Sequence, residues 1–220
     1  MTVLHAAVAR FLGVLRQRIE AEPANDPGFI RERDALLSVW PTPEDDGSAS
    51  AARAVAQDLA PVLAPALAPA CGFLPAALDA ACDGPERTIG ETLLAIAPAL
   101  AWGYGYPADP RRPDLPEAVA FADIAGKQGL VTAPGIGIGL TLIAPETLYP
   151  SHAHPAVEFY LVLSGTAAWT AGADVAAARP PGSLILHPES IPHAMATGRE
   201  PLLAIFTWHG DIASPSVYLD

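Results

Sequence analysis

Residues 149–160 read YPSHAHPAVEFY, a segment that begins and ends with a tyrosine. Four polar residues at even-numbered positions stand out within it: His152, His154, Glu158 and Tyr160. Side chains alternate between the two faces of an extended chain, so these four would share one side, while the other side is apolar. Pro155 predicts an interruption just after His154, such as a turn or a bulge. The pattern is typical of a chain that lines a pocket with one face and packs against a second layer with the other.

A second segment, PGSLILHPESIPH (residues 181–193), predicts a turn, a short apolar strand, another turn and then a histidine. The two segments together supply three imidazoles and one carboxylate: His152, His154, Glu158 and His193. Such a set suits one borderline divalent metal ion, with Fe, Zn, Mn, Ni and Co all admitted, and it leaves positions open for water or substrate. We interpret the other two downstream histidines, His187 and His209, as structural.

The spacing HxH-x3-E-x6-G, followed by PxG and a later histidine, resembles the two motifs of the cupin superfamily over roughly residues 135–208. The resemblance implies a metal-binding jelly-roll barrel, also called a double-stranded β-helix. Two positions depart from the usual motifs. Glu146 stands where a glycine is usual, and Thr197 stands where an asparagine often closes the second motif. Neither departure removes a ligand, so the sequence resembles a divergent cupin.

The composition limits the partners that the protein can have. The chain of 220 residues has a formal net charge of −12, and Lys127 is its single lysine. Such a chain is a poor candidate for binding nucleic acid or an anionic membrane. The N-terminus lacks the basic-then-apolar pattern of a signal peptide, and no apolar run reaches a membrane-spanning length. We therefore expect a soluble, cytoplasmic protein whose partner is a small molecule.

The first half of the chain has the spacing of helices. Residues 2–20 place apolar side chains at helical intervals, Asp26-Pro27 predicts the start of a second helix, and Ser48 or Ser50 that of a third, through Leu59. A further helical segment runs from Thr88 to about Leu100. We expect residues 1–116 to be mostly helical and to contribute no catalytic cluster. This region would cover one face of a barrel or form the interface of a homodimer.

The second half changes to β character. Short apolar runs separated by glycine-rich turns predict a sandwich or barrel over residues 117–220, so the fold class is mainly β with an α-helical N-terminal region. Between the halves, residues 101–116 contain the aromatic run Trp-Gly-Tyr-Gly-Tyr-Pro. We interpret this segment as a packed linker, with a lid or pocket wall as the alternative.

The positions of the tyrosines point to one family within the cupin superfamily. The order Tyr-x2-His-x-His-x3-Glu-x-Tyr, then a distant histidine and a late tryptophan, resembles the cupin-type dimethylsulfoniopropionate (DMSP) lyases. These are bacterial enzymes with a helical part before the barrel, although the helical half matches here in architecture and not in motifs. The resemblance implies that the substrate is DMSP, a small zwitterion, and that the products are dimethyl sulfide and acrylate.

In this interpretation each residue type has a role. The metal binds the substrate carboxylate and acidifies the neighbouring C–H bond. The phenolate of Tyr160 removes that proton, and Tyr149 orients the substrate. In the alternative assignment the two tyrosines exchange these roles. The aromatic faces that would hold the sulfonium by cation–π attraction are Tyr149, Trp169 and Trp208. The spacing alone also allows Tyr160 to be an ordinary strand aromatic.

The sequence also allows two other classes of function. Another metal-dependent cupin enzyme, such as a dioxygenase or an isomerase, would use the same four ligands. A small-molecule sensor would normally add a DNA-binding module, and the sequence has no basic pair of helices. The ligand set does not select the native metal among the ions that it admits.

Overall fold

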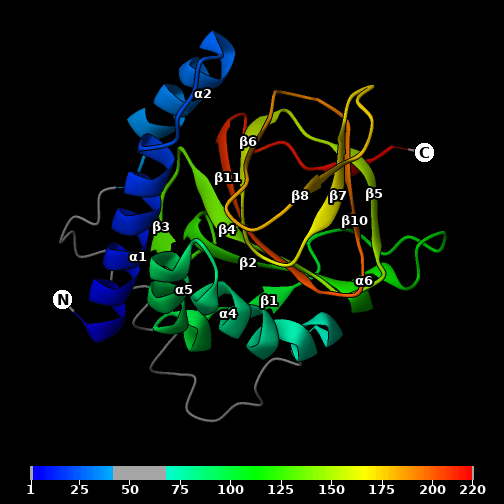
Figure 1. The fold of residues 1–220 in the computed structure, drawn as a ribbon, viewed down its shortest axis with the longest axis horizontal. Helices are drawn as coiled ribbons and strands as arrows, with labels where there is room; N and C mark the ends of the chain where they lie inside the picture. Colours follow the sequence, from blue (N-terminus) through cyan, green and yellow to red (C-terminus); the bar gives the residue numbers. More distant parts are fainter. Residues whose placement is uncertain (1, 42–67, 220) are drawn as a thin grey trace.

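Antiparallel strands make up most of the second half of the chain. The structure is a computed structural model that describes residues 2–41 and 68–219. The helix expected from residue 48 or 50 through residue 59 lies outside the described residues. Figure 1 shows a barrel of strands with helices gathered along one side of it.

Two sheets face each other across the barrel (Figure 1). The larger sheet has the order β1 (Trp102–Gly103), β2 (Val119–Gly126), β4 (Gly137–Ile143), β11 (Leu202–Gly210), β6 (Ala156–Ser164) and β9 (Leu184–His187), and β3 (Val131–Thr132) pairs in parallel with β2. The smaller sheet has the order β12 (Val217–Tyr218), β5 (Leu148–Ala153), β10 (His193–Thr197), β7 (Ala167–Ala171) and β8 (Ala177–Arg179). Every strand pair except β2–β3 is antiparallel.

The helices lie against the outer face of the larger sheet. They are α1 (Val3–Glu20), α2 (Pro27–Ser38), α4 (Leu74–Asp83) and α5 (Arg87–Leu94), with the short elements η1 (Pro69–Phe73) and η2 (Ala97–Ala99). The short helix α6 (Leu115–Ala118) leads into β2 instead, and its Leu115 packs with the core inside the barrel. The first two predicted helices are confirmed. The side chain of Asp26 accepts hydrogen bonds from the backbone N–H groups of Gly28 and Phe29, which caps α2. The aromatic ring of Phe29 then packs edge-on against Phe159 of β6.

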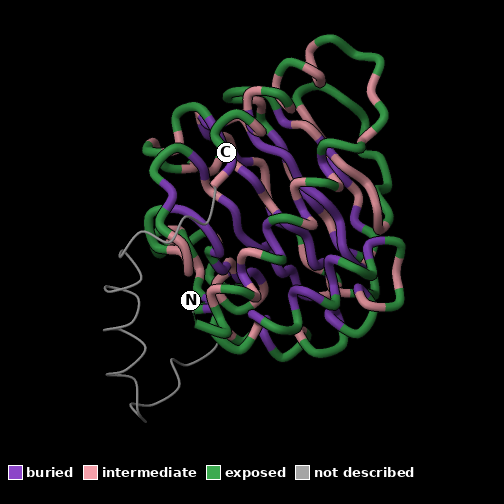
Figure 2. Tube along the Cα trace, turned by 90° about the vertical axis from the view of Figure 1, so that its left-hand side faces the viewer, coloured by how far each residue is buried: buried purple, intermediate pink, exposed green. Residues whose placement is uncertain are grey.

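Alternation along the strands separates two hydrophobic cores. On β6, Phe159, Leu161 and Leu163 pack with the helices, while Tyr160 and Val162 point into the barrel. The buried strands run through the middle of Figure 2, with exposed loops at both ends. This confirms the two-faced pattern predicted for the second part of the motif segment.

The motif segment is nevertheless two strands and not one. Strand β5 ends at Ala153 and β6 begins at Ala156, so His154 and Pro155 form the link between the smaller and the larger sheet. The predicted interruption is confirmed, and the idea of one continuous polar face is corrected. Because the chain changes sheets here, the polar residues before and after the link approach one another across the barrel.

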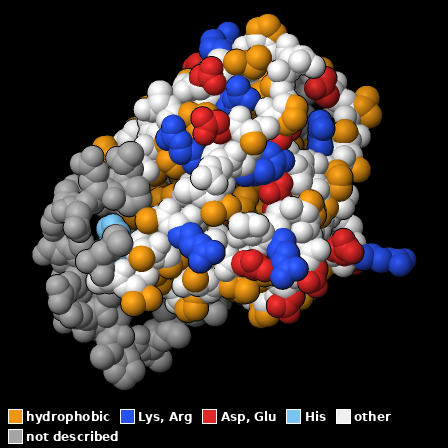
Figure 3. Space-filling model, turned by 60° about the vertical axis from the view of Figure 1, so that its left-hand side comes forward, with side chains coloured by type: hydrophobic (Ala, Val, Ile, Leu, Met, Phe, Trp, Pro, Cys, Tyr) orange, Lys and Arg blue, Asp and Glu red, His pale blue; other side chains and the backbone are white. Residues whose placement is uncertain are grey.

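The boundary between the two regions is not sharp. Strand β1 belongs to the larger sheet although it lies within the region expected to be helical, and α6 spans the expected boundary between residues 116 and 117. None of the helices that the structure describes is long and apolar enough to cross a membrane. On the face drawn in Figure 3, basic side chains are interspersed with acidic ones and do not form a single basic patch.

Candidate active site

The register of the larger sheet places three polar residues side by side inside the barrel. Glu158 of β6 pairs with Trp208 of β11 on one side and with His187 of β9 on the other. In the next inward-facing row, Tyr160 of β6 pairs with Phe206 of β11, which in turn pairs with Gly139 of β4. Strand pairing alone therefore surrounds Glu158 and Tyr160 with side chains that approach from neighbouring strands.

Three histidines are oriented in the same way by the backbone. Nδ1 of His152, His154 and His193 lies 2.9, 3.0 and 2.9 Å from the carbonyl oxygens of residues 150, 156 and 191, respectively. A carbonyl oxygen only accepts hydrogen bonds, so Nδ1 of each ring carries a hydrogen. In the neutral imidazole, Nε2 then presents a lone pair. This orientation by the second ring nitrogen is typical of histidines that bind metals.

Two of these lone pairs converge on one carboxylate oxygen. Nε2 of His154 and of His193 lie 3.1 and 3.2 Å from Oε2 of Glu158, and the three residues form a buried group whose ligand atoms lie within 4.8 Å of one another. Although burial acts in the opposite direction, contacts with the histidines hold the pKa of Glu158 well below its usual range. For His154, burial alone would lower the pKa. The contact with the Glu158 carboxylate outweighs burial, so the pKa of His154 is raised overall.

This donor set fits a divalent metal ion. Two nitrogen lone pairs and a carboxylate oxygen this close together repel one another unless a cation lies between them. The raised pKa of His154 shows that the site favours a positive charge, and a borderline divalent ion would supply more of it. The residue types and their spacing thus indicate that the site binds a cation.

His152 lines the same cavity but stands apart from the group of three. Its ring centroid lies 4.0 Å from that of His193, 6.3 Å from that of His154 and 4.2 Å from that of Tyr149. Burial, together with the charge of His193, lowers the pKa of His152 to about 3, so its ring is neutral near pH 7. Its role as a fourth ligand stays a prediction.

The two histidines that the sequence left as structural have different positions. His209 lies on the outer face of β11, where Nε2 is 3.3 Å from Oε2 of Glu32 on α2. His187 points into the barrel: its Nδ1 is 3.5 Å from Oε2 of Glu158, and its ring centroid is 4.0 Å from that of His193. The motif spacing singles out His193 and gives His187 no role, because the β6–β9 register, which the sequence does not reveal, determines what lies beside Glu158.

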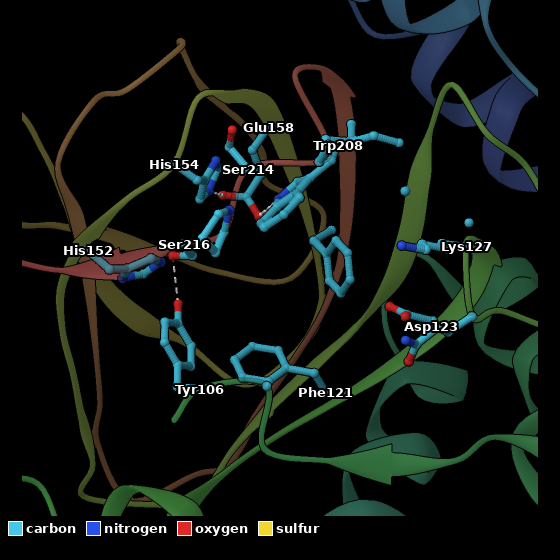
Figure 4. A pocket seen from close by; sticks show the side chains of 18 of the residues that line it. Tyr106, Phe121, Asp123, Lys127, His152, His154, Glu158, Trp208, Ser214 and Ser216 are labelled. Carbon is cyan, nitrogen blue, oxygen red and sulfur yellow. Dashed lines mark hydrogen bonds and ion pairs between the residues drawn. The ribbon is translucent and has the colours of Figure 1, made fainter. Parts of the chain in front are cut away.

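A cavity of about 500 Å³ opens beside this cluster (Figure 4). Two glycines of β4 shape its wall: Gly137 lines the cavity, and Gly139 leaves room for the ring of Phe206. A Cβ atom added at Gly139 would lie 2.4 Å from the ring of Phe206 and 2.6 Å from a backbone oxygen of β2. The Phe206 ring therefore lies over this glycine and forms part of the wall.

The aromatic segment between the two halves also forms part of the wall. Tyr106 lines the cavity, and its hydroxyl contacts the hydroxyl of Tyr149. The same hydroxyl lies 2.8 Å from the Oγ atom of Ser216 (Figure 4). Burial raises the pKa of Tyr106 to about 12 and that of Tyr149 well above its usual range. The alternative interpretation of residues 101–116 as a pocket wall is therefore the correct one at Tyr106. The sequence feature that indicated a pocket wall is the aromatic run Trp-Gly-Tyr-Gly-Tyr.

Tyr160 lines the cavity next to Glu158, whereas Trp169 does not. Burial, with the negative charge of Glu158, raises the pKa of Tyr160 well above its usual range. Trp169 packs behind Tyr160, with ring centroids 4.9 Å apart, and is absent from the cavity wall. The structure therefore does not bring Trp169 to the cavity wall, and its expected contact with the substrate stays a prediction. Trp208 does line the cavity, and its indole N–H donates to Oε1 of Glu158 over 2.7 Å.

Two facing, mostly antiparallel sheets with a His–Glu–His cluster between them define a barrel of the cupin type. The chain belongs to the dimethylsulfoniopropionate lyase family, whose family model matches residues 48–204.

The individual relatives agree with this assignment. The chain is 34% identical over 139 residues to DddL of Cereibacter sphaeroides, whose name assigns it to the DMSP lyases, and the match covers 62% of this chain and 57% of DddL. It is 26% identical over 129 residues to the DMSP lyase DddQ of Ruegeria pomeroyi, covering 59% of this chain and 64% of DddQ. The matches thus span 57% and 64% of the length of these curated relatives.

A crystal structure described for the DMSP lyases RdDddP and RnDddQII is similar in fold. It covers 99% of this chain and 100% of its own, with a TM-score of 0.66 and 22% sequence identity. At this identity the similarity shows the fold alone.

Proposed function

We propose that this protein is a metal-dependent lyase that cleaves DMSP to dimethyl sulfide and acrylate by β-elimination. The observation that carries the proposal is the position of Tyr160, which lines the cavity one inward-facing position along β6 from Glu158. Membership of the DMSP lyase family supports the same activity. The inferred partner is thus a small zwitterionic molecule.

His154, Glu158 and His193 would hold the metal, with His152 as the fourth ligand expected from the sequence. A divalent cation there would withdraw charge from the substrate carboxylate, acidify the adjacent C–H bond and favour the phenolate of Tyr160. The backbone carbonyls that accept from the Nδ1 atoms hold the rings in the orientation that ligation needs.

Tyr160 is the proposed base. Its oxygen takes the proton from the carbon next to the substrate carboxylate, a carbon–carbon double bond forms, and the C–S bond breaks with its electron pair going to sulfur. The sulfonium leaves as a neutral sulfide, so the step needs no general acid. In the metal-free barrel the raised pKa of Tyr160 keeps the phenol protonated, which makes removal of that proton dependent on a cation in the site.

The remainder of the cavity suits the cationic end of a zwitterion. Trp208 and Phe206 present aromatic faces, each worth about 0.5–2 kcal/mol for a cation. Asp123 of β2 follows Phe121 on the inward-facing side of its strand and also lines the cavity. A metal held by the histidine cluster would bind the carboxylate of such a molecule, and the Asp123 carboxylate on another wall would attract its onium group.

The experiment is a product analysis with purified protein loaded with one metal at a time. Given DMSP without oxygen, the protein should release dimethyl sulfide and acrylate in equal amounts, and removal of the metal with a chelator should abolish release. His154→Ala is the matched negative variant, and His5→Ala, at a partly exposed helical position outside the cavity, is the control that keeps activity.

Two results would overturn the proposal. Absence of dimethyl sulfide with every divalent metal would exclude the lyase reaction. Product formation that requires oxygen would favour the alternative cupin class, a dioxygenase, because elimination consumes no oxidant.

A further inference from the structure

His187 is a buried histidine without a hydrogen-bond partner. The residue is 1% exposed, and among residues 2–41 and 68–219 neither of its ring nitrogens finds a partner. The other three histidines inside the barrel each use Nδ1 on a backbone carbonyl. Buried polar groups in native proteins are normally paired, so the exception at His187 requires a reason.

The nearest carboxylate to His187 is that of Glu158. The β6–β9 register places the two residues directly opposite each other, and Nδ1 of His187 lies 3.5 Å from Oε2 of Glu158. This nitrogen is the one that His152, His154 and His193 turn away from the cluster. His187 therefore approaches Glu158 with the opposite end of its ring.

The chemistry of the pair determines where the hydrogen of the imidazole lies. A carboxylate only accepts hydrogen bonds, so a neutral ring facing it is stabilised when Nδ1 carries the hydrogen and is repelled when Nδ1 carries the lone pair. His187 is thus suited to donate to Glu158, whereas His154 and His193 are suited to share their lone pairs with a metal. On the other side of Glu158, Trp208 already donates to Oε1.

We propose that His187 is a positioning residue that holds the carboxylate of Glu158 through its Nδ1–H, opposite to Trp208. The two donors flank the only carboxylate of the cluster from both neighbouring strands and fix its rotation. The inference rests on the proposed function only in requiring a metal at this site. It adds a residue to which the motif spacing gives no role.

The test measures metal binding and not turnover. Cobalt(II) affinity is determined by competition with a chelator, and the absorption spectrum of the bound ion reports its ligands. His187→Leu removes both ring nitrogens, whereas His187→Asn keeps an N–H donor near the position of Nδ1 and removes Nε2. His209→Leu is the matched control, because it replaces another buried histidine on the outer face of the sheet. Thermal unfolding of each metal-free variant confirms that it folds.

The proposal predicts a rescue pattern. His187→Leu should weaken cobalt binding about 10–100-fold, the usual effect of losing a group that orients a ligand. His187→Asn should stay close to the wild-type affinity with an unchanged spectrum, and His209→Leu should match the wild type. A residue that only fills space would not be rescued by a donor.

Three results would overturn it. If His187→Leu binds cobalt as tightly as the wild type, Glu158 does not need this donor. If His187→Asn is as weak as His187→Leu, Nδ1–H is not what holds Glu158, and an accompanying spectral change would make His187 itself a ligand. If the wild type binds no divalent metal, this inference fails together with the metal part of the proposed function. The wild-type measurement therefore separates the two failures.

Discussion

Trp208 donates its indole N–H to Oε1 of Glu158 over 2.7 Å, from β11 to the adjacent strand β6. The same side chain lines the cavity, and its ring centroid lies 4.3 Å from that of His154. The polar end of Trp208 is therefore engaged with a proposed metal ligand, while its aromatic face is available to a cationic group. The sequence suggested only the second of these roles.

Replacing Trp208 with phenylalanine separates the two roles. Trp208→Phe keeps an aromatic face but loses the N–H donor, so metal affinity should fall about 10–100-fold because Glu158 is less firmly oriented. At saturating metal, KM for DMSP should change little. Chelator competition and steady-state kinetics measure the two effects. Unchanged metal affinity with a raised KM would mean that the N–H donor has no role and that the indole serves the substrate alone.

Asp123 should contribute to binding of the cationic end of the substrate. Its carboxylate lines the cavity, and burial raises the pKa of Asp123 above its ordinary value. Asp123→Asn should raise KM for DMSP roughly tenfold, about 1.4 kcal/mol, and leave metal affinity unchanged. Asp79→Asn, at an exposed position on α4, is the control.

The pH dependence of Asp123 has a defined sign. An onium group binds the ionised carboxylate, so binding should be complete above the raised pKa and should weaken as the pH falls through it. Because the pKa is raised, this loss should begin at a higher pH than for an ordinary aspartate, whose pKa is about 3.9. A KM with the same pH profile in wild type and Asp123→Asn would contradict the assignment.

Metal binding should ionise Tyr160. Burial and Glu158 raise the pKa of Tyr160 in the metal-free protein, and a divalent cation beside Glu158 opposes both effects. Adding Zn(II) at a pH below the ordinary tyrosine pKa of about 10 should therefore produce the ultraviolet difference absorbance of a tyrosinate. The signal should be absent in Tyr160→Phe and present in Tyr149→Phe. The same signal in both variants would assign it to another tyrosine.

Two glycines should respond to alanine in opposite directions. Gly139→Ala places a methyl group 2.4 Å from the Phe206 ring and 2.6 Å from a backbone oxygen, so it should destabilise the protein by about 1–3 kcal/mol. Gly13→Ala meets no atom within 4 Å in the middle of α1 and should stabilise it by about 0.5–1 kcal/mol. Urea unfolding measures both. A neutral Gly139→Ala would mean that Phe206 does not need this position to be empty.

The sequence predicted the residues of the site better than their geometry. The motif spacing identifies His154, Glu158 and His193 because ligand identity lies in the residues themselves. It also predicts the interruption at Pro155, since proline cannot donate to a strand ladder. It does not reveal that the chain changes sheets there, because pairing partners lie far away in the sequence.

The residues that the sequence missed are those that non-local pairing brings in. His187 reaches Glu158 through the β6–β9 register, and Tyr106 reaches Tyr149 because a segment of irregular structure folds against the barrel mouth. Trp169 shows the opposite case: its residue type suits a cation, but its ring packs against Tyr160 and does not line the cavity. Side-chain chemistry is local in the sequence, whereas orientation depends on contacts between distant segments.

Turnover of Tyr160→Phe at saturating metal decides whether Tyr160 is the base beside the metal. The substitution removes one oxygen and keeps the buried ring, so folding and metal content should survive. We predict that kcat falls about 10²–10⁴-fold, the usual contribution of a positioned base, while KM changes less.

Tyr149→Phe is the matched comparison, because Tyr149 also lines the cavity but its hydroxyl contacts Tyr106. A phenol that orients the substrate should alter KM at least as much as kcat. Release of dimethyl sulfide by metal-loaded Tyr160→Phe at the wild-type rate would mean that Tyr160 is not the base. If Tyr149→Phe were inactive in that case, the two tyrosines would exchange roles.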